Sequence, residues 1–155
     1  MLKALKNLFE DAAPASETLA GQEQKSLKLA VASVLHEATR VDLNDAPEEH
    51  AAAERALASL FSLSAAASAA LLKEGRERAK RLTSYYAPVS VIKREFDLPR
   101  RVLLIEHLWR IAYADGRLDQ YEDHFVRKIA HLLYVPNTQC ILARNRARPV
   151  PDKKT

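Results

Sequence analysis

Apolar residues recur every three or four positions along most of the chain, in segments separated by prolines, glycines or acidic turns. This spacing places them on one face of an α-helix. No segment alternates steadily between apolar and polar residues, as a half-buried strand would. We therefore predict an all-α protein, a single compact domain of about seven helices. The predicted helices span residues 22–40, 47–61, 65–82, 89–96, 99–114, 120–135 and 138–146.

The predicted helix over residues 99–114 is the most apolar of the chain. Because it is apolar nearly all round, we expect it at the centre of the domain. Asp97 precedes it as a predicted N-cap. Ser64 and Asp119 are predicted to cap the helices that follow them in the same way. Such side chains accept hydrogen bonds from N–H groups that have no partner inside the helix.

A short acidic turn occurs twice in the chain. In the first copy, Asp42 ends an apolar, helix-like run and Glu49 lies at the start of the next one. Asp115 and Glu122 have the same spacing in the second copy, 73 residues further on. The sequence therefore predicts two helix–acidic turn–helix units that form an approximate internal repeat.

Length and composition are those of a soluble globular domain. A chain of 155 residues can bury a substantial core without disulfides or metals. Cys140 is the only cysteine, which excludes an internal disulfide and fits a reducing compartment. There is no apolar run of about 18 residues and no signal-peptide pattern at the start. We predict a cytoplasmic protein without a transmembrane segment.

The predicted organisation has three parts. Residues 1–20 form an N-terminal amphipathic segment and a linker, residues 21–147 form the helical domain, and residues 148–155 form a disordered basic tail. The apolar positions of the N-terminal segment are Leu2, Leu5, Leu8 and Phe9.

The net charge of +4 is distributed unevenly. Residues 1–63 carry 6 Lys/Arg and 10 Asp/Glu, whereas residues 64–155 carry 18 Lys/Arg and 10 Asp/Glu. A basic stretch from Lys73 to Arg81 could contact nucleic acid or anionic lipid. Acidic residues interrupt this stretch, which is typical of ordinary ion pairs on a helix surface. We therefore do not expect nucleic-acid binding, and a peripheral membrane contact remains an alternative.

The carboxylates of the two turns are candidate ligands for a divalent cation, because Ca²⁺ and Mg²⁺ prefer oxygen donors. The second turn is not an EF-hand, since its third loop position is Arg117 and its twelfth is Val126. A site would therefore have to be assembled across both turns or completed by water. The candidate ligands are Asp42, Asp45, Glu49, Asp115, Asp119 and Glu122.

Helix capping is the alternative explanation for these carboxylates. The pairs Asp119–Glu122 and Asp45–Glu48 both have capping-box spacing, with Asp in place of the usual Ser or Thr. Capping explains Asp42 and Asp115 less well, because a carboxylate at a helix C-terminus opposes the helix dipole. The sequence leaves a cation site and simple capping open.

Catalytic chemistry finds little support. The chain has no nucleophile-elbow motif, no phosphate-binding glycine loop and no His-Glu-x-x-His motif. The five histidines do not form a spacing typical of zinc sites, and a lone buried cysteine such as Cys140 is usually inert. We therefore predict no enzymatic activity.

The second unit resembles the signature of the tellurite-resistance protein B (TerB) family. That signature is an apolar helix ending in Ala114-Asp115-Gly116, then an acidic turn and a helix that opens with Glu122. The first unit resembles the family's N-terminal copy, with Leu43 in place of the glycine and Ala46 where Asp119 stands in the second. The resemblance covers roughly residues 22–146.

The resemblance implies an all-helical fold of about seven helices, acidic turns able to bind a divalent cation, and an association with tellurite and stress resistance. It implies no enzyme activity. The leading hypothesis is a non-enzymatic helical module that is gated by a divalent cation and recognised by protein partners. The alternative is a metal-independent protein-interaction domain whose acidic turns are only helix caps. An enzyme would need Asp42 and Asp115 to converge in a cleft, and the sequence gives no sign of one.

Overall fold

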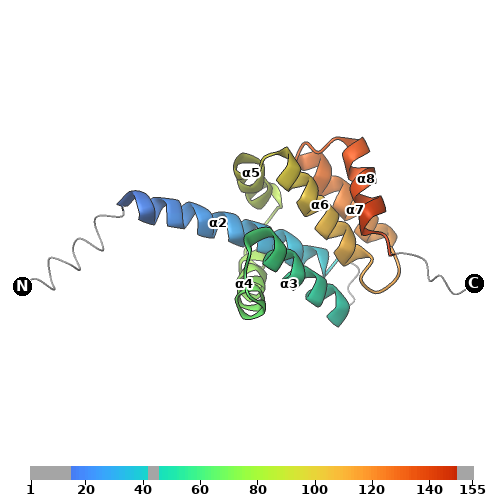
Figure 1. The fold of residues 1–155 in the computed structure, drawn as a ribbon, viewed down its shortest axis with the longest axis horizontal. Coiled ribbons are helices and arrows are strands. Elements are labelled where there is room, and N and C mark those ends of the chain that lie inside the picture. The colour runs from blue at the N-terminus through green and yellow to red at the C-terminus, as the bar shows by residue number, and fades with distance from the viewer. Residues whose placement is uncertain (1–14, 42–45, 150–155) are drawn as a thin grey trace, which may run out of the picture.

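The computed structural model describes residues 15–41 and 46–149, which contain seven helices and no strand. The prediction of an all-α domain is confirmed. Figure 1 shows the helices in chain order. They are α2 (Ala15–Ala38), α3 (Pro47–Phe61), α4 (Ala65–Ala79), α5 (Tyr86–Glu95), α6 (Leu98–Ala112), α7 (Gln120–Leu132) and α8 (Asn137–Ala147).

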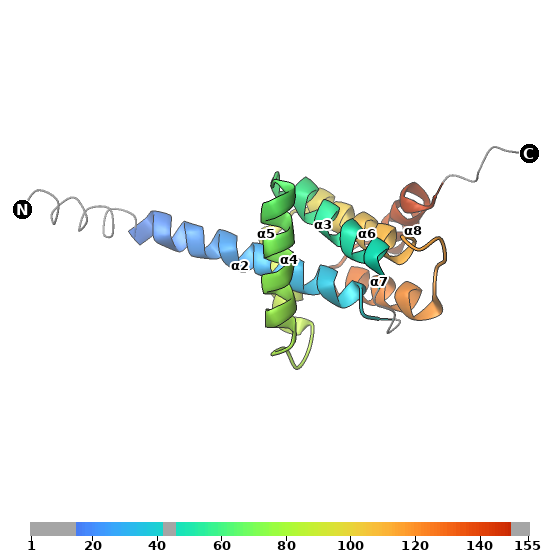
Figure 2. The same cartoon turned by 90° about the horizontal axis from the view of Figure 1, so that it is seen from below.

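Helix α2 begins seven residues before the predicted start at residue 22. The first seven residues of α2 were not predicted to be helical, because residues 15–21 are helix-compatible but carry no apolar face. The N-terminal half of α2 projects away from the other helices (Figures 1 and 2). Leu19 on this half is 60% exposed. The amphipathic positions predicted within residues 2–9 lie outside the described residues.

Helix α6 lies at the centre of the domain, as predicted. Every residue from Leu104 to Trp109 is buried, so this stretch of α6 is enclosed on all sides. The indole Nε1 of Trp109 donates a hydrogen bond of 3.1 Å to the carbonyl of Cys140 on α8. The polar edge of the largest core side chain therefore has a partner, as a buried Trp requires.

The internal repeat extends over three helices in each unit, rather than the two that the acidic turns predicted. The first unit is α2–α3–α4 and the second is α6–α7–α8, with α5 between them (Figure 1). In each unit the third helix packs against the first. Residues in the left-handed conformation follow α3 and α7, namely Ser62 with φ 54° and Tyr134 with φ 56°. The repeat thus includes the way in which the middle helices end.

Buried positions of the two units coincide when the chain is shifted by 73 residues. This shift superimposes apolar core positions of α2 on α6 and of α3 on α7, so the repeat is a repeat of core packing. The fully or almost fully buried pairs are Val31 and Leu104, Leu35 and Leu108, Ala53 and Val126, Ala56 and Ile129, Leu57 and Ala130, and Leu60 and Leu133.

Two neighbouring arginines at the start of α6 bind the ends of both middle helices, and the bond from Arg100 joins the two units. Arg100 donates from Nη2 to the carbonyl of Leu60 at 2.5 Å, and Arg101 donates from Nη1 to the carbonyl of Leu133 at 2.6 Å. These carbonyls are equivalent in the repeat and lie at the C-terminal ends of α3 and α7. Cationic donors are favourable there, because the last carbonyls of a helix lack internal partners.

Candidate cation site at the two acidic turns

The two helix junctions that carry the acidic residues lie at the same end of the molecule. In both views, the end of α2 and the start of α3 are near the end of α6 and the start of α7 (Figures 1 and 2). The repeat therefore brings its two turns to one region. Asp42 and Asp45 of the first turn lie outside the described residues.

The second turn is fully described. Helix α6 ends at Ala112, and Gly116 has φ 88°, a left-handed conformation that favours glycine. The exposed Asp115 accepts a hydrogen bond at Oδ1 from the backbone N–H of Arg117, at 3.0 Å. This bond holds the Asp115 carboxylate within the turn by a local contact with the backbone.

Asp119 is the N-cap of α7, as predicted. Its Oδ1 accepts from the backbone N–H of Tyr121 at 2.7 Å, which satisfies one donor of the first helical turn. Glu122, at the third helical position, is only 2% exposed. Capping explains the position of Asp119, but it does not explain why Glu122 lies in the interior.

The first turn differs at its cap. The N-cap position of α3 is Ala46, which makes no side-chain cap bond, and Pro47 follows at the first helical position. The predicted capping box of Asp45 and Glu48 was therefore wrong, because its spacing is one residue out of register with the N-cap and third positions. The third position is Glu49, whose side chain is 0% exposed.

Glu49 and Glu122 are equivalent in the repeat, and both are buried. Both side chains have interaction partners in the structure. Burying an ionised carboxylate is costly unless it is compensated by hydrogen bonds or by opposite charge. The helix N-terminus supplies part of this compensation, because its dipole favours negative charge. Sequence analysis singled out both residues by their spacing, but their burial became visible only in the fold.

The described candidate ligands do not form a complete metal site on their own. Within residues 15–41 and 46–149, no three His, Cys, Asp or Glu side chains are grouped so as to hold an ion. Of the predicted ligands, this part of the chain contains Glu49, Asp115, Asp119 and Glu122. A site at this end of the molecule therefore needs Asp42, Asp45 or water in addition.

A buried histidine lies beside the first turn. His36, near the end of α2, is 4% exposed, and its ring centroid is 6.5 Å from that of His50 on α3. Burial lowers the pKa of His36 to about 4, and the nearby cations Arg40 and Arg76 act in the same direction. His36 is therefore neutral at pH 7. It is thus an uncharged histidine in the interior.

Tyr85 connects the two units close to the turns. Its hydroxyl lies 3.5 Å from Glu37 Oε2 of α2, and its ring packs edge-on against Phe125 of α7 at 5.5 Å. The ammonium of Lys128 lies 5.4 Å from the centre of the same ring. This role of Tyr85 was not predicted, because nothing in the local sequence signals a contact with both units.

The fold and the turns define a class of helical proteins built from two acidic-turn repeats. The sequence model of the tellurite resistance protein TerB family matches residues 28–145. The chain belongs to this family, as the resemblance of its second turn predicted. No curated protein and no solved structure matches the chain. In the described part of the chain, no single helix is long and apolar enough to cross a membrane. Helices α3 and α4 reach that length and apolarity only when taken together, and they are bent by 110° relative to one another.

Proposed function

We propose that this protein is a non-enzymatic TerB-family module of the cytoplasmic stress response, including resistance to tellurite, whose two acidic turns bind one divalent cation. The observation that carries the cation proposal is the pair Glu49 and Glu122, which are equivalent in the repeat and both buried in the first turns of α3 and α7. These two helices begin at the same end of the molecule (Figures 1 and 2). A cation of the Ca²⁺ or Mg²⁺ type would compensate their charge and accept the harder oxygen donors of both turns.

In this proposal the cation joins the two units. Each unit supplies one buried glutamate from the first turn of its middle helix, and Asp42, Asp45, Asp115 and Asp119 complete the ligand set with water. Without the cation, carboxylates from both turns repel one another. The bound state would therefore fix the two turns relative to one another, and protein partners would recognise that surface.

A second candidate is a metal-independent interaction domain, in which the aspartates only cap and order the turns. The bonds from Arg117 N–H to Asp115 and from Tyr121 N–H to Asp119 favour it. The two candidates differ in what they require of charge. A cap needs an oxygen acceptor, which asparagine also provides, whereas a cation site needs the carboxylate.

Thermal unfolding of metal-stripped protein distinguishes the candidates. Ca²⁺, Mg²⁺ or Mn²⁺ should raise the Tm of the wild-type protein saturably, since a ligand that binds only the folded state stabilises it. Asp115→Asn and Asp119→Asn should unfold at nearly the wild-type Tm without metal and lose the shift with metal. Asp97→Asn is the matched control, because Asp97 caps α6 outside the turns through the N–H of Arg100. Absence of a shift with every ion in the wild-type protein would contradict the cation proposal and favour the capping candidate.

A further inference from the structure

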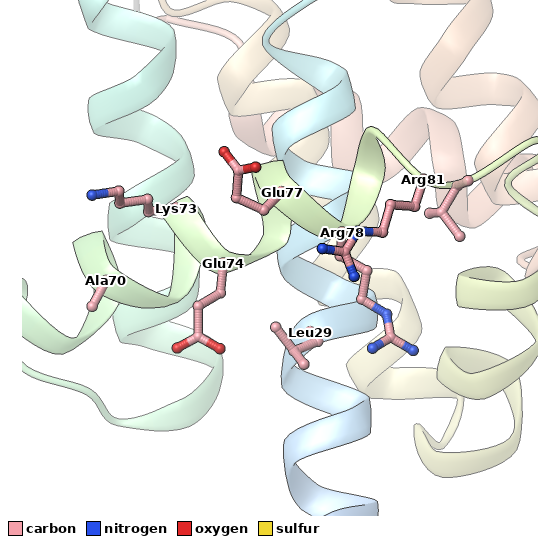
Figure 3. Close-up of a pocket in the computed structure, with 8 residues that line it drawn as sticks. Leu29, Ala70, Lys73, Glu74, Glu77, Arg78 and Arg81 are labelled. Carbon is pink, nitrogen blue, oxygen red and sulfur yellow. The ribbon is translucent and has the colours of Figure 1, made fainter.

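A hollow of about 770 Å³ lies between α4 and α2, beside Leu29 (Figure 3). Leu29 of α2 and Ala70 of α4 contribute apolar surface to it. The long side chains of Lys73, Glu74 and Arg78 line it as well, so aliphatic stems add to its walls while charges lie at the rim. The hollow is thus suited to an amphipathic segment with charges of both signs.

The rim of the hollow carries cationic side chains that an incoming segment can contact. Among the described residues, Lys80 is paired with Glu77 at 3.1 Å, whereas Lys73 and Arg78 take part in no ion pair. Both are exposed. An incoming segment can therefore contact cations here without breaking an existing pair.

The chain itself contains a segment of the matching chemistry. Residues 2–9 place leucines and a phenylalanine at helical spacing, which makes the segment amphipathic. Lys3 and Lys6 complement the acidic part of the rim, and Glu10 and Asp11 complement the basic part. The apolar residues are Leu2, Leu5, Leu8 and Phe9.

The direction of α2 decides which copy of the segment can occupy the hollow. From Leu29 to Ala15 the helix carries the chain about 21 Å away from the hollow, at 1.5 Å per residue. Phe9 is six residues before Ala15, so it can return at most about 21 Å, and only with a fully extended linker that reverses at once. Binding within one chain is therefore at the limit of reach, whereas the hollow of a neighbouring copy is under no such limit.

We propose that residues 2–9 of one copy bind in the α2–α4 hollow of a second copy. The exchange is reciprocal in a two-fold dimer, because each copy carries both the segment and the hollow. Leu5 and Leu8 contact the apolar surface around Leu29 and Ala70, and the charged residues of the segment meet the rim. The projecting half of α2 gains a partner in the same assembly.

Cysteine cross-linking tests which copy is bound. Chains with Leu5→Cys are mixed with chains carrying Ala70→Cys, and disulfide formation is followed by mass under mild oxidation. Cys140 does not compete, because it is 2% exposed and burial raises the pKa of its thiol. We expect a cross-linked dimer in the mixture. Leu142→Cys, on α8 at a position 49% exposed, replaces Ala70→Cys as the control and should give none.

A single chain carrying both Leu5→Cys and Ala70→Cys tests whether the segment binds within its own chain. If it closes an internal disulfide at high dilution while the mixture gives no dimer, the segment binds its own chain and the proposal is overturned. Absence of a cross-link in both experiments overturns it as well.

Sedimentation of the full chain gives an independent measurement. The wild-type protein should show a concentration-dependent monomer–dimer equilibrium, and Leu5→Glu should weaken association at least tenfold. Leu142→Glu, which introduces the same charge on an exposed leucine elsewhere, should leave it unchanged. A wild-type protein that is monomeric throughout, or one whose dimer is indifferent to Leu5→Glu, would contradict the proposal.

Discussion

The two units of the repeat bury the same positions but hold their third helix by different means. In the first unit α4 lies close against α2, and a Cβ added at Gly75 would lie 2.5 Å from the Cβ of Ala32. The hydroxyl of Ser33 donates to the carbonyl of Leu29 in its own helix at 2.7 Å, and it also lies within 3.4 Å of the carbonyl of Gly75 on α4. In the second unit the residue equivalent to Ser33 is Glu106, which pairs with Arg110 at 2.7 Å and with Arg146 of α8.

This difference separates what the fold requires from what it tolerates. Apolar core positions repeat because they define where the helices lie. The third helix is held against the first either by the close approach of small residues or by an ion pair between long side chains. The first kind of contact is sensitive to side-chain volume, and the second is sensitive to charge and salt. The units should therefore fail under different perturbations.

The largest effect is expected from pH, through one buried histidine in each unit. The pKa of His36 and that of His107 are both lowered from 6.5 to about 4, in each case mainly by burial. Below pH 6.5 the unfolded chain binds protons that the folded chain does not, so stability falls as the pH drops from 6.5 to 4. Each histidine should contribute a loss of about 3 kcal/mol over this window.

Urea unfolding at pH 7 and pH 5 measures the part of this loss that falls above pH 5, about 2 kcal/mol for each histidine. His36→Gln and His107→Gln should each flatten the decline. Salt sharpens the comparison. His36 is surrounded by cations such as Arg40 and Arg76, whereas His107 has Arg110 on one side and Glu106 on the other. Added salt should reduce the His36 contribution more than that of His107. A wild-type pH slope in both variants would contradict this assignment.

Gly75→Ala should be the next largest perturbation, and it acts on the first unit alone. Its methyl group would lie 2.5 Å from the Cβ and 2.7 Å from the backbone carbon of Ala32, so the helices must separate. We expect a loss of about 2 kcal/mol in the free energy of urea unfolding, despite the better helix propensity of alanine. Gly21→Ala is the matched control: no atom lies within 4 Å of its added Cβ, and it should stabilise α2 by up to about 1 kcal/mol. Effects of the same sign at both sites would contradict the close approach.

Glu106→Gln tests the corresponding contact of the second unit. It leaves the shape of the side chain but removes the charge that Arg110 and Arg146 share. Because both arginines are about half exposed, solvent screening limits the expected loss to about 1.5 kcal/mol. The loss should shrink in 1 M salt. Ser33→Ala at the equivalent position should cost less than about 1 kcal/mol and show no salt dependence.

The smallest effects concern the two caps, which differ between otherwise equivalent positions. Asp119→Ala should lower the free energy of unfolding by about 1 kcal/mol, because it removes the acceptor for Tyr121 N–H. Ala46→Ser should raise it by about 0.5 kcal/mol, because α3 makes no side-chain cap bond. Equal and negligible effects of both substitutions in chemical unfolding would show that the caps do not matter.

The fold class and the repeat could be predicted from sequence because both are local patterns repeated along the chain. The spacing of apolar residues predicted helices over residues 22–40 and 99–114, and Leu35 and Leu108 within them are buried. The third helix of each unit was not recognised as part of the repeat. The buried residues of these helices differ in type, with Ser68, Leu72, Gly75 and Ala79 in α4 and Cys140 and Ala143 in α8, so they give no sequence similarity.

The candidate site was predictable only in part. Spacing alone singled out Glu49 and Glu122, but their burial depends on how α3 and α7 pack, which no local pattern encodes. The capping-box spacing of Asp45 and Glu48 falls one residue away from the N-cap position of α3, which Ala46 occupies without a side-chain cap bond. The role of Tyr85 was missed, since it follows from contacts with residues far away in sequence.

The central claim is that the two turns form one cation site shared by both units. Isothermal titration calorimetry of metal-stripped protein with Ca²⁺ and with Mg²⁺ tests it directly, using Glu49→Gln, Glu122→Gln and the double variant. The account predicts one ion per wild-type chain, and an equal loss of affinity in either single variant that the double variant does not deepen. Two ions per chain, losses confined to one turn, or no binding by the wild-type protein would contradict it.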